Sequence, residues 1–294
     1  MVTKRRLPIR DIDPRALFSD VAVDASNTYL AGFAFDESPR LVAIAHGATA
    51  PHLVVAAKRA PPLLLLACDD ALLIAAAERR IVRVDTRTGA LSKLVETPVA
   101  MTTALALDHD WIYGTVIGPG GGVFRAPRSG GALSWVHRGR AVSLAVSRGR
   151  VAFGDGDRLW LKESESSVLR RLADPAHPHS IAFLGDEIFW TEFTPEGSLC
   201  ALDLATGLRR VIAASPYSSA LVALGGHLYW AQSSRNAQPW LWRVRPDDPS
   251  SIEPILKGRC KRGHLAGEGA TLSWFGDLAG GAHALDLSAL ASRS

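Results

Sequence analysis

The sequence predicts an all-β fold, a seven-bladed β-propeller whose N-terminal strand completes the C-terminal blade and so closes the ring. Three observations lead to this prediction. A unit of about 40 residues recurs along the chain, each full unit carries four short apolar segments, and the last unit lacks its fourth segment. One four-stranded sheet cannot bury both of its faces, whereas a ring of such sheets buries them against each other.

The first marker of the unit is a pair of apolar segments that flank a polar turn, clearest at residues 105–113, 181–190 and 221–230. The second segment often ends in an aromatic side chain, which we expect to pack as a wedge between neighbouring blades. Weaker copies complete the series of positions predicted to be equivalent, which are Leu30, Leu73, Tyr113, Phe153, Trp190, Trp230 and Trp274.

A second marker keeps the same period. Shortly after each of these positions an alternating apolar strand runs into a turn, as at residues 81–89 and 199–207, and a further apolar strand ends the unit. The Asp residues of these turns, such as Asp85 and Asp203, are predicted to bond to the turn backbone. The expected blades are approximately 19–60, 61–99, 100–139, 140–178, 179–218, 219–262 and 263–294, the last completed by strand 4–12.

The termini determine the number of blades. The last unit supplies three strands before the chain ends, and residues 4–12 carry apolar side chains at strand-like intervals outside the first unit. Pairing this segment with the last blade closes the ring and leaves no long unpaired edge. Pro8 is compatible with an outermost strand, where a missing backbone donor faces solvent. We therefore expect a single domain over residues 1–294.

Composition excludes several classes of protein. A hydrophobic fraction of 47% predicts a packed core, and a formal net charge of only +4 without a long basic run argues against nucleic-acid binding. The three cysteines are far apart, which argues against a disulfide framework or a Cys-rich zinc site. No signal-peptide pattern follows the N-terminal basic residues, and the longest apolar run, 60–68, is too short to cross a bilayer. We expect a cytoplasmic monomer that binds no membrane.

Two strand sequences carry a family resemblance. The segments IFWTE at 188–192 and HLYWA at 227–231 resemble the Tyr-Trp-Thr-Asp strand of propellers in low-density-lipoprotein-receptor proteins. The cadence of residues 105–131 is similar to the repeat of bacterial YWTD-like propellers. The resemblance covers residues 21–287 and implies a propeller, although the receptor propellers have six blades. It implies no active site, because the motif residues are structural.

Alternating strand direction places the loops between blades and the loops between second and third strands on one face, here called the mouth. Propellers commonly bind their ligands there. The segment DPAHPH at 174–179 puts His177 and His179 in one such loop, where they could act as acid and base or bind a metal with Glu192. Tyr217 lies in the next inter-blade loop. The alternative, which we favour, is that a Pro-rich loop exposes its histidines without using them.

A second group of mouth residues consists of hydrogen-bond donors. Together they could bind an anionic group such as a carboxylate or phosphate. Scattered surface cations are the more common explanation of such a group. Its members are Gln232, Arg235, Arg259, Arg262 and His264.

No motif for a cofactor is found, and we expect none. The Gly-rich loop 118–122 follows a strand and opens no helix, so it is not predicted to bind phosphate. Two classes of function stay open. The favoured one is a binding protein that takes a small molecule or a protein partner at the mouth. The alternative is a small-molecule tailoring enzyme, such as a lyase, hydrolase or cyclase of secondary metabolism, with its site in the central funnel.

Overall fold

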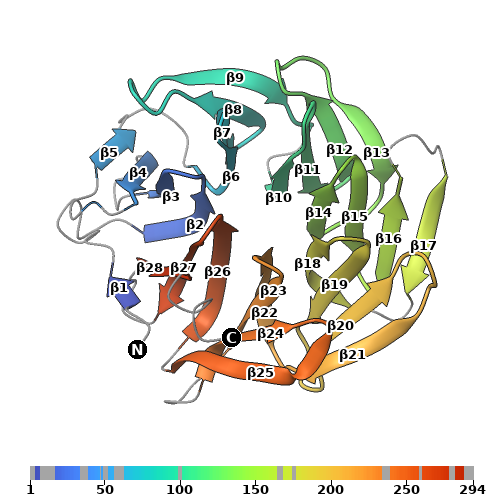
Figure 1. Ribbon diagram of the computed structural model, residues 1–294. Coiled ribbons are helices and arrows are strands. Elements are labelled where there is room, and N and C mark those ends of the chain that lie inside the picture. The colour runs from blue at the N-terminus through green and yellow to red at the C-terminus, as the bar shows by residue number, and fades with distance from the viewer. Residues whose placement is uncertain are drawn as a thin grey trace.

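The computed structural model describes residues 4–6, 17–33, 39–46, 48, 52–55, 63–98, 101–163, 168–173, 177–233, 239–257, 260–277 and 282–287. Their regular elements are strands, which form seven four-stranded antiparallel sheets arranged as a ring (Figure 1). This arrangement confirms the predicted seven-bladed propeller. Among the described residues no helix is long and apolar enough to span a membrane.

Each blade is a meander that runs from the axis outward. Blade 1 comprises β2 (Leu17–Val23), β3 (Asn27–Phe33), β4 (Pro39–Ala45) and β5 (His52–Val55). Blade 2 comprises β6 (Leu65–Asp69), β7 (Leu72–Ala77), β8 (Arg80–Val84) and β9 (Leu91–Glu96). Blade 3 comprises β10 (Met101–Leu107), β11 (Trp111–Ile117), β12 (Gly122–Pro127) and β13 (Ser134–Arg138).

The next three blades repeat the pattern. Blade 4 comprises β14 (Ser143–Ser147), β15 (Arg150–Asp155), β16 (Arg158–Lys162) and β17 (Leu169–Ala173). Blade 5 comprises β18 (Pro178–Leu184), β19 (Glu187–Glu192), β20 (Ser198–Asp203) and β21 (Arg209–Ala214). Blade 6 comprises β22 (Ser218–Leu224), β23 (His227–Gln232), β24 (Pro239–Arg245) and β25 (Asp248–Lys257).

Blade 7 is assembled from both ends of the chain. Its first three strands are β26 (Cys260–Glu268), β27 (Thr271–Asp277) and β28 (Ala282–Asp286). The fourth is β1 (Lys4–Arg6), which pairs antiparallel with β28 through Lys4 and Leu285, Arg5 and Ala284, and Arg6 and His283 (Figure 1). The predicted closure is therefore confirmed. Residues 7–12 of the predicted strand lie outside the described residues.

The first and second strands of every blade pair with one common spacing. In each blade an apolar residue of the first strand faces the residue nine positions further along the chain, as Ile181 faces Trp190 (190 − 181 = 9). The seven pairs are Val21–Leu30, Leu66–Ala75, Leu105–Gly114, Leu144–Phe153, Ile181–Trp190, Leu221–Trp230 and Leu265–Trp274.

Two of the positions predicted to be equivalent are wrong, because Ala75 and Gly114 occupy the places assigned to Leu73 and Tyr113. In blade 3 the aromatic ring comes from the neighbouring strand instead. A Cβ atom at Gly114 would lie 2.5 Å from the ring of Phe124, so glycine there makes room for that ring. In blade 3 the predicted position followed the nearest aromatic residue and missed the register by one residue, and in blade 2 Leu73 missed it by two.

The aromatic residues of the second strands are core residues, as predicted. Trp190, Trp230 and Trp274 are at most 2% exposed, and each packs in a cluster that joins two successive blades. The indole of Trp230 also donates a hydrogen bond to Ser215 Oγ at 2.6 Å. Burial of such large apolar surfaces between sheets is what holds the ring together.

The face opposite the mouth, here called the lower face, carries the turns between third and fourth strands. Asp85 accepts hydrogen bonds from the backbone N–H groups of Arg87 and Thr88, and Asp203 accepts them from Ala205 and Thr206. Gly89 and Gly207 follow with φ of +72° and +73°. Blades 2 and 5 thus form the same type of turn with the same types of residue. This confirms the predicted turn-forming role of both aspartates.

Candidate functional site at the channel mouth

A central channel of about 740 Å³ runs along the axis of the ring. All seven first strands, β2, β6, β10, β14, β18, β22 and β26, contribute to its wall. Small residues such as Ala22, Ala106 and Ala266 line it part-way down. Cys68 also reaches it, but burial raises the pKa of this thiol and the charge of Asp24 raises it further. The thiol is therefore protonated at neutral pH and is a poor nucleophile.

A β-bulge occurs at the same place in four of the first strands. The register slips two positions before the paired apolar residue in blades 1, 3, 5 and 6. A bulge bends the strand and re-aims the side chain of the extra residue. That residue is polar in all four blades, and three of the four line the channel. The bulge residues are Ser19, Thr103, His179 and Ser219.

The next residue of the first strand connects successive blades. Asp20 Oδ2 accepts a hydrogen bond from the Leu66 N–H at 2.8 Å, and Ser180 Oγ accepts one from the Leu221 N–H at 3.1 Å. These two bonds join equivalent atoms in different blades. At the same position in blade 4, Ser143 Oγ donates to the Pro178 carbonyl at 3.0 Å. The polar residues at the mouth therefore have a structural task as well as access to the channel.

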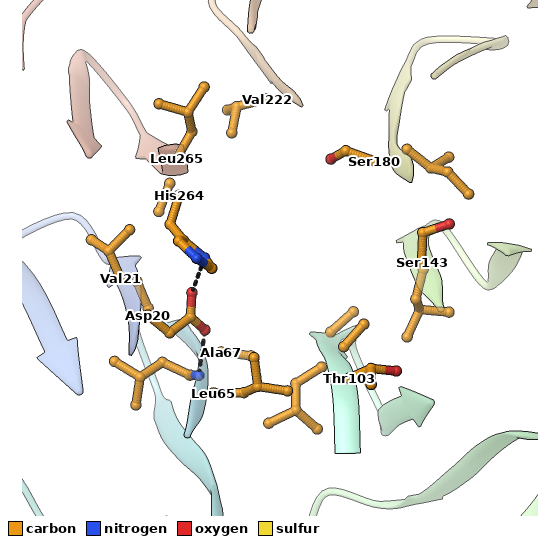
Figure 2. A pocket seen from close by; sticks show the side chains of 18 of the residues that line it. Asp20, Val21, Leu65, Ala67, Thr103, Ser143, Ser180, Val222, His264 and Leu265 are labelled. Carbon is orange, nitrogen blue, oxygen red and sulfur yellow. Dashed lines mark hydrogen bonds and ion pairs between the residues drawn. The ribbon is translucent and has the colours of Figure 1, made fainter. Parts of the chain in front are cut away.

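Asp20 and His264, here called the rim pair, form a histidine–carboxylate contact within the channel. His264 Nδ1 lies 3.5 Å from Asp20 Oδ1, and the pair spans the seam between blades 7 and 1. The His264 side chain is 42% exposed and that of Asp20 15%. Figure 2 shows both projecting into the opening, with the Ser180 hydroxyl pointing into it from the opposite side. A carboxylate beside one ring nitrogen orients the imidazole.

The two predicted loop histidines lie in different surroundings. His179 lines the channel and stacks on Phe193 with ring centroids 4.9 Å apart. His177 is exposed and is not among the channel-lining residues. It has φ +39°, and Tyr217, the equivalent residue one blade later, has φ +55°. The structure therefore brings His179 to the channel and leaves His177 outside it.

Glu192 and Gln232 end the second strands of blades 5 and 6. The Glu192 carboxylate contacts Arg209 and the Trp190 indole N–H, each at 3.4 Å, toward the outer strands of its blade. Neither Glu192 nor Gln232 is among the residues that line the channel. Glu192 pairs with Pro178 across β18 and β19, so it lies beside both histidines, while its carboxylate bonds toward Arg209. Within the described residues, no three His, Cys, Asp or Glu side chains are grouped to hold a metal ion.

The predicted cation cluster is only partly described. Arg235 and Arg259 lie outside the described residues, and of Arg262 the structure describes the backbone, which belongs to β26. His264 is the one member of this group that is placed in the channel wall. The described part of the lining holds the carboxylates of Asp20 and Glu268 and neither lysine nor arginine.

Sequence reasoning missed Asp20, Thr103, Ser143, Ser180 and Ser219. Each stands one or two positions before the paired apolar residue of its first strand. A repeat alignment on the nine-residue spacing would have shown polar residues at this point in most blades. The residues predicted from the sequence lie in loops instead, because loops usually carry binding residues.

A smaller cavity of about 460 Å³ opens on the lower face between blades 1 and 2. Aspartates line it, but they are bonded within the protein. Asp24 accepts hydrogen bonds from two backbone N–H groups of its own turn and from the Tyr29 hydroxyl. Asp69 forms a two-point ion pair with Arg128 of blade 3. Burial is the largest single effect on Asp69 and opposes its ionisation, but the hydrogen bonds from Arg128 and from the Ala71 and Leu72 N–H groups, together with the Arg128 charge, outweigh it and lower the pKa of this carboxyl.

Comparison with known proteins supports the fold. No protein-family model matches the chain, and no curated protein matches it. An oligogalacturonate lyase in complex with manganese is 14% identical with a TM-score of 0.67, over 98% of both chains. A chain of a nidogen/laminin complex is 18% identical with a TM-score of 0.60, over 74% of this chain and 90% of that one.

A third similar structure is PorZ, a bacterial surface component of the type-IX secretion system of Porphyromonas gingivalis. It is 10% identical with a TM-score of 0.67, over 92% of this chain and 37% of that one. Because all these identities are low, the likeness shows a shared propeller fold alone. A lyase and a chain from a laminin complex thus share this scaffold while differing in what they do.

Proposed function

We propose that this chain is a binding protein that takes a small molecule at the mouth of its central channel. The observation that supports the proposal is the rim pair facing Ser180 across a cavity of about 740 Å³ (Figure 2). The volume lies within the range of pockets that bind small ligands, and a few convergent polar groups over apolar walls are typical of such pockets. We also infer that the repeat is YWTD-like, because the two quoted motifs occupy the second strands β19 and β23.

The binding proposal is tested with a matched pair of double variants. A metabolite library is screened by thermal shift, and hits are titrated by calorimetry against wild type and an Asp20→Asn/His264→Gln variant. Asparagine keeps an acceptor for the Leu66 N–H, so the blade contact is retained. We expect the variant to weaken binding at least tenfold.

The control is His109→Gln/Asp110→Asn. This pair has the same chemistry, with His109 Nδ1 2.9 Å from Asp110 Oδ1, but lies exposed in a turn of the lower face. Its substitution should leave affinity unchanged. Hits that bind both double variants as tightly as wild type would place the ligand elsewhere and contradict the proposal.

The rim pair also favours a second candidate function, an enzyme that uses His264 as a general base. Its imidazole is oriented by Asp20 and opens on a cavity, which is the arrangement that acid–base catalysis requires. A lyase among the structures of similar fold makes elimination a reaction to test first. His264→Gln should lower the rate at least a hundredfold. Activity that survives this change would exclude His264 as the base.

A further inference from the structure

Three rings from three different segments meet at the edge of the channel. His179 is the bulge residue of β18, Phe193 follows β19, and Tyr217 precedes β22. His179 stacks on Phe193, and Phe193 meets Tyr217 edge-on with ring centroids 5.7 Å apart. These three residues are here called the aromatic shelf. Because His179 also lines the channel, the shelf and the channel are continuous.

The outer end of the shelf is open to solvent. Tyr217 is 43% exposed, which makes it one of few large hydrophobic side chains so exposed among the described residues. An exposed aromatic ring beside a cavity presents apolar surface that a ligand can cover. The core does not use this surface, since the buried aromatic clusters lie between the sheets.

The Tyr217 loop is held in place by contacts with both adjoining blades. The Tyr217 N–H donates to the Thr194 carbonyl at 3.0 Å, and its own carbonyl accepts from the Ser233 N–H at 3.0 Å. The Trp230 indole donates to Ser215 Oγ, whose hydroxyl lies 2.5 Å from that of Ser218. A loop fixed this way keeps its ring in position without a ligand, which lowers the entropic cost of binding.

The backbone at Tyr217 does not require a side chain. Its φ of +55° is in the left-handed region that glycine adopts most easily. His177, at the equivalent position one blade earlier, has φ +39°, and its N–H donates to the backbone carbonyl of Asp157 in the matching loop. The turn is therefore a repeated device, and a bulky residue in it carries a cost. Such a cost at a cavity edge is a reason to infer a function for the ring.

We propose that the aromatic shelf stacks a ring of a short saccharide, which deepens and rests on the proposed binding function. A sugar ring has an apolar C–H face that packs on an aromatic ring, and its edge carries hydroxyl groups. The rim pair and Ser180 offer acceptors and donors for those hydroxyls within the same cavity. An exposed aromatic ring at the edge of a cavity with such groups matches this two-sided chemistry better than it matches a wholly apolar or a strongly anionic ligand.

The test titrates the full-length protein with the uncharged trisaccharides cellotriose, xylotriose and maltotriose and with chitotriose by calorimetry. We expect at least one of these sugars to bind. The Tyr217→Ala and Phe193→Ala substitutions should each weaken the affinity for that sugar about tenfold, whereas Tyr217→Phe should retain it. Trp135→Ala is the control, because Trp135 lies in the outer strand of blade 3 beneath Arg138. Thermal melts of each variant verify folding.

Two results would overturn the saccharide assignment. One is that no probe binds at millimolar concentration, and the other is that a probe binds Tyr217→Ala and Phe193→Ala as tightly as it binds the wild type. The proposed function is judged separately by the library screen. A hit that depends on the rim pair but not on the shelf would leave the binding function standing and refute the shelf. A sugar whose binding depends on the shelf but not on the rim pair would support the shelf and exclude the rim pair from the binding site.

Discussion

On the lower face, Asp85 and Asp203 occupy equivalent turns and make the same backbone contacts, whereas at the mouth His177 and Tyr217 occupy equivalent turns with unrelated side chains. The lower-face carboxylates are already hydrogen-bonded to the backbone of the turns that they stabilise. In the mouth turns His177 and Tyr217 contribute backbone hydrogen bonds, which leaves their own side chains available. Repeated chemistry therefore indicates scaffold in this ring, and divergent chemistry at equivalent positions indicates where function can reside.

The largest effect should come from the core that both faces share. Trp230→Ala removes a side chain that is 2% exposed and leaves Ser215 without its indole donor. We expect a loss of about 3–5 kcal/mol in the free energy of unfolding, measured by urea denaturation. Tyr217→Ala, one loop away, should cost under about 1 kcal/mol. Equal losses for the two variants would remove the distinction between core and mouth.

Two glycines of the repeated lower-face turn separate backbone strain from packing. A Cβ atom at Gly89 would lie 2.1 Å from the Val54 carbonyl oxygen, whereas at Gly207 nothing lies within 4 Å. Both have the same positive φ, so Gly207→Ala should cost about 1 kcal/mol and Gly89→Ala about 2–4 kcal/mol in urea denaturation. If the two cost the same, the turn of blade 2 does not pack on blade 1 as described.

An ion pair on the lower face should make the free energy of unfolding depend on pH. The lowered pKa of Asp69 means that its ion pair with Arg128 contributes stability above the carboxyl's unfolded pKa of about 3.9 and loses it as pH falls through the folded value. Arg128→Met should therefore reduce the acid-side fall in unfolding free energy between pH 7 and pH 3. The effect is small, because the Asp69 side chain is 40% exposed.

Arg150→Met is the matched control for that titration. Arg150 also bridges to the next blade, but its partner Asp186 is 77% exposed. We expect this variant to keep the wild-type acid profile. A fall of the same size in wild type and in Arg128→Met would show that the ion pair does not contribute.

The smallest effect tests the backbone at the mouth. With φ of +55° at Tyr217, glycine is the unstrained residue, so Tyr217→Gly should be more stable than Tyr217→Ala by about 1 kcal/mol. Paired thermal melts and urea titrations can resolve the difference. An alanine variant as stable as the glycine variant would indicate that the loop relaxes out of this conformation and is not fixed by its contacts.

The period, the number of blades, the closing strand and the wedge tryptophans could all be predicted from the sequence. These features are local or repeated. A polar turn between two apolar strands can be recognised within a few residues, and its recurrence along the chain supports the assignment. Even so, the register failed in blade 3, because Gly114 depends on Phe124 in the next strand.

The arrangement of the candidate site could not be predicted in the same way, because it depends on contacts between distant parts of the chain. The rim pair joins Asp20 to His264, which are separated by nearly the whole chain and meet because the ring closes. The shelf needs a bulge at His179 and two loops from adjoining blades. Which way a side chain points changes with a one-residue shift in register, and bulges of this kind depend on strand pairing that no single segment encodes. The sequence contains these residues, but it does not show that they lie close together in the fold.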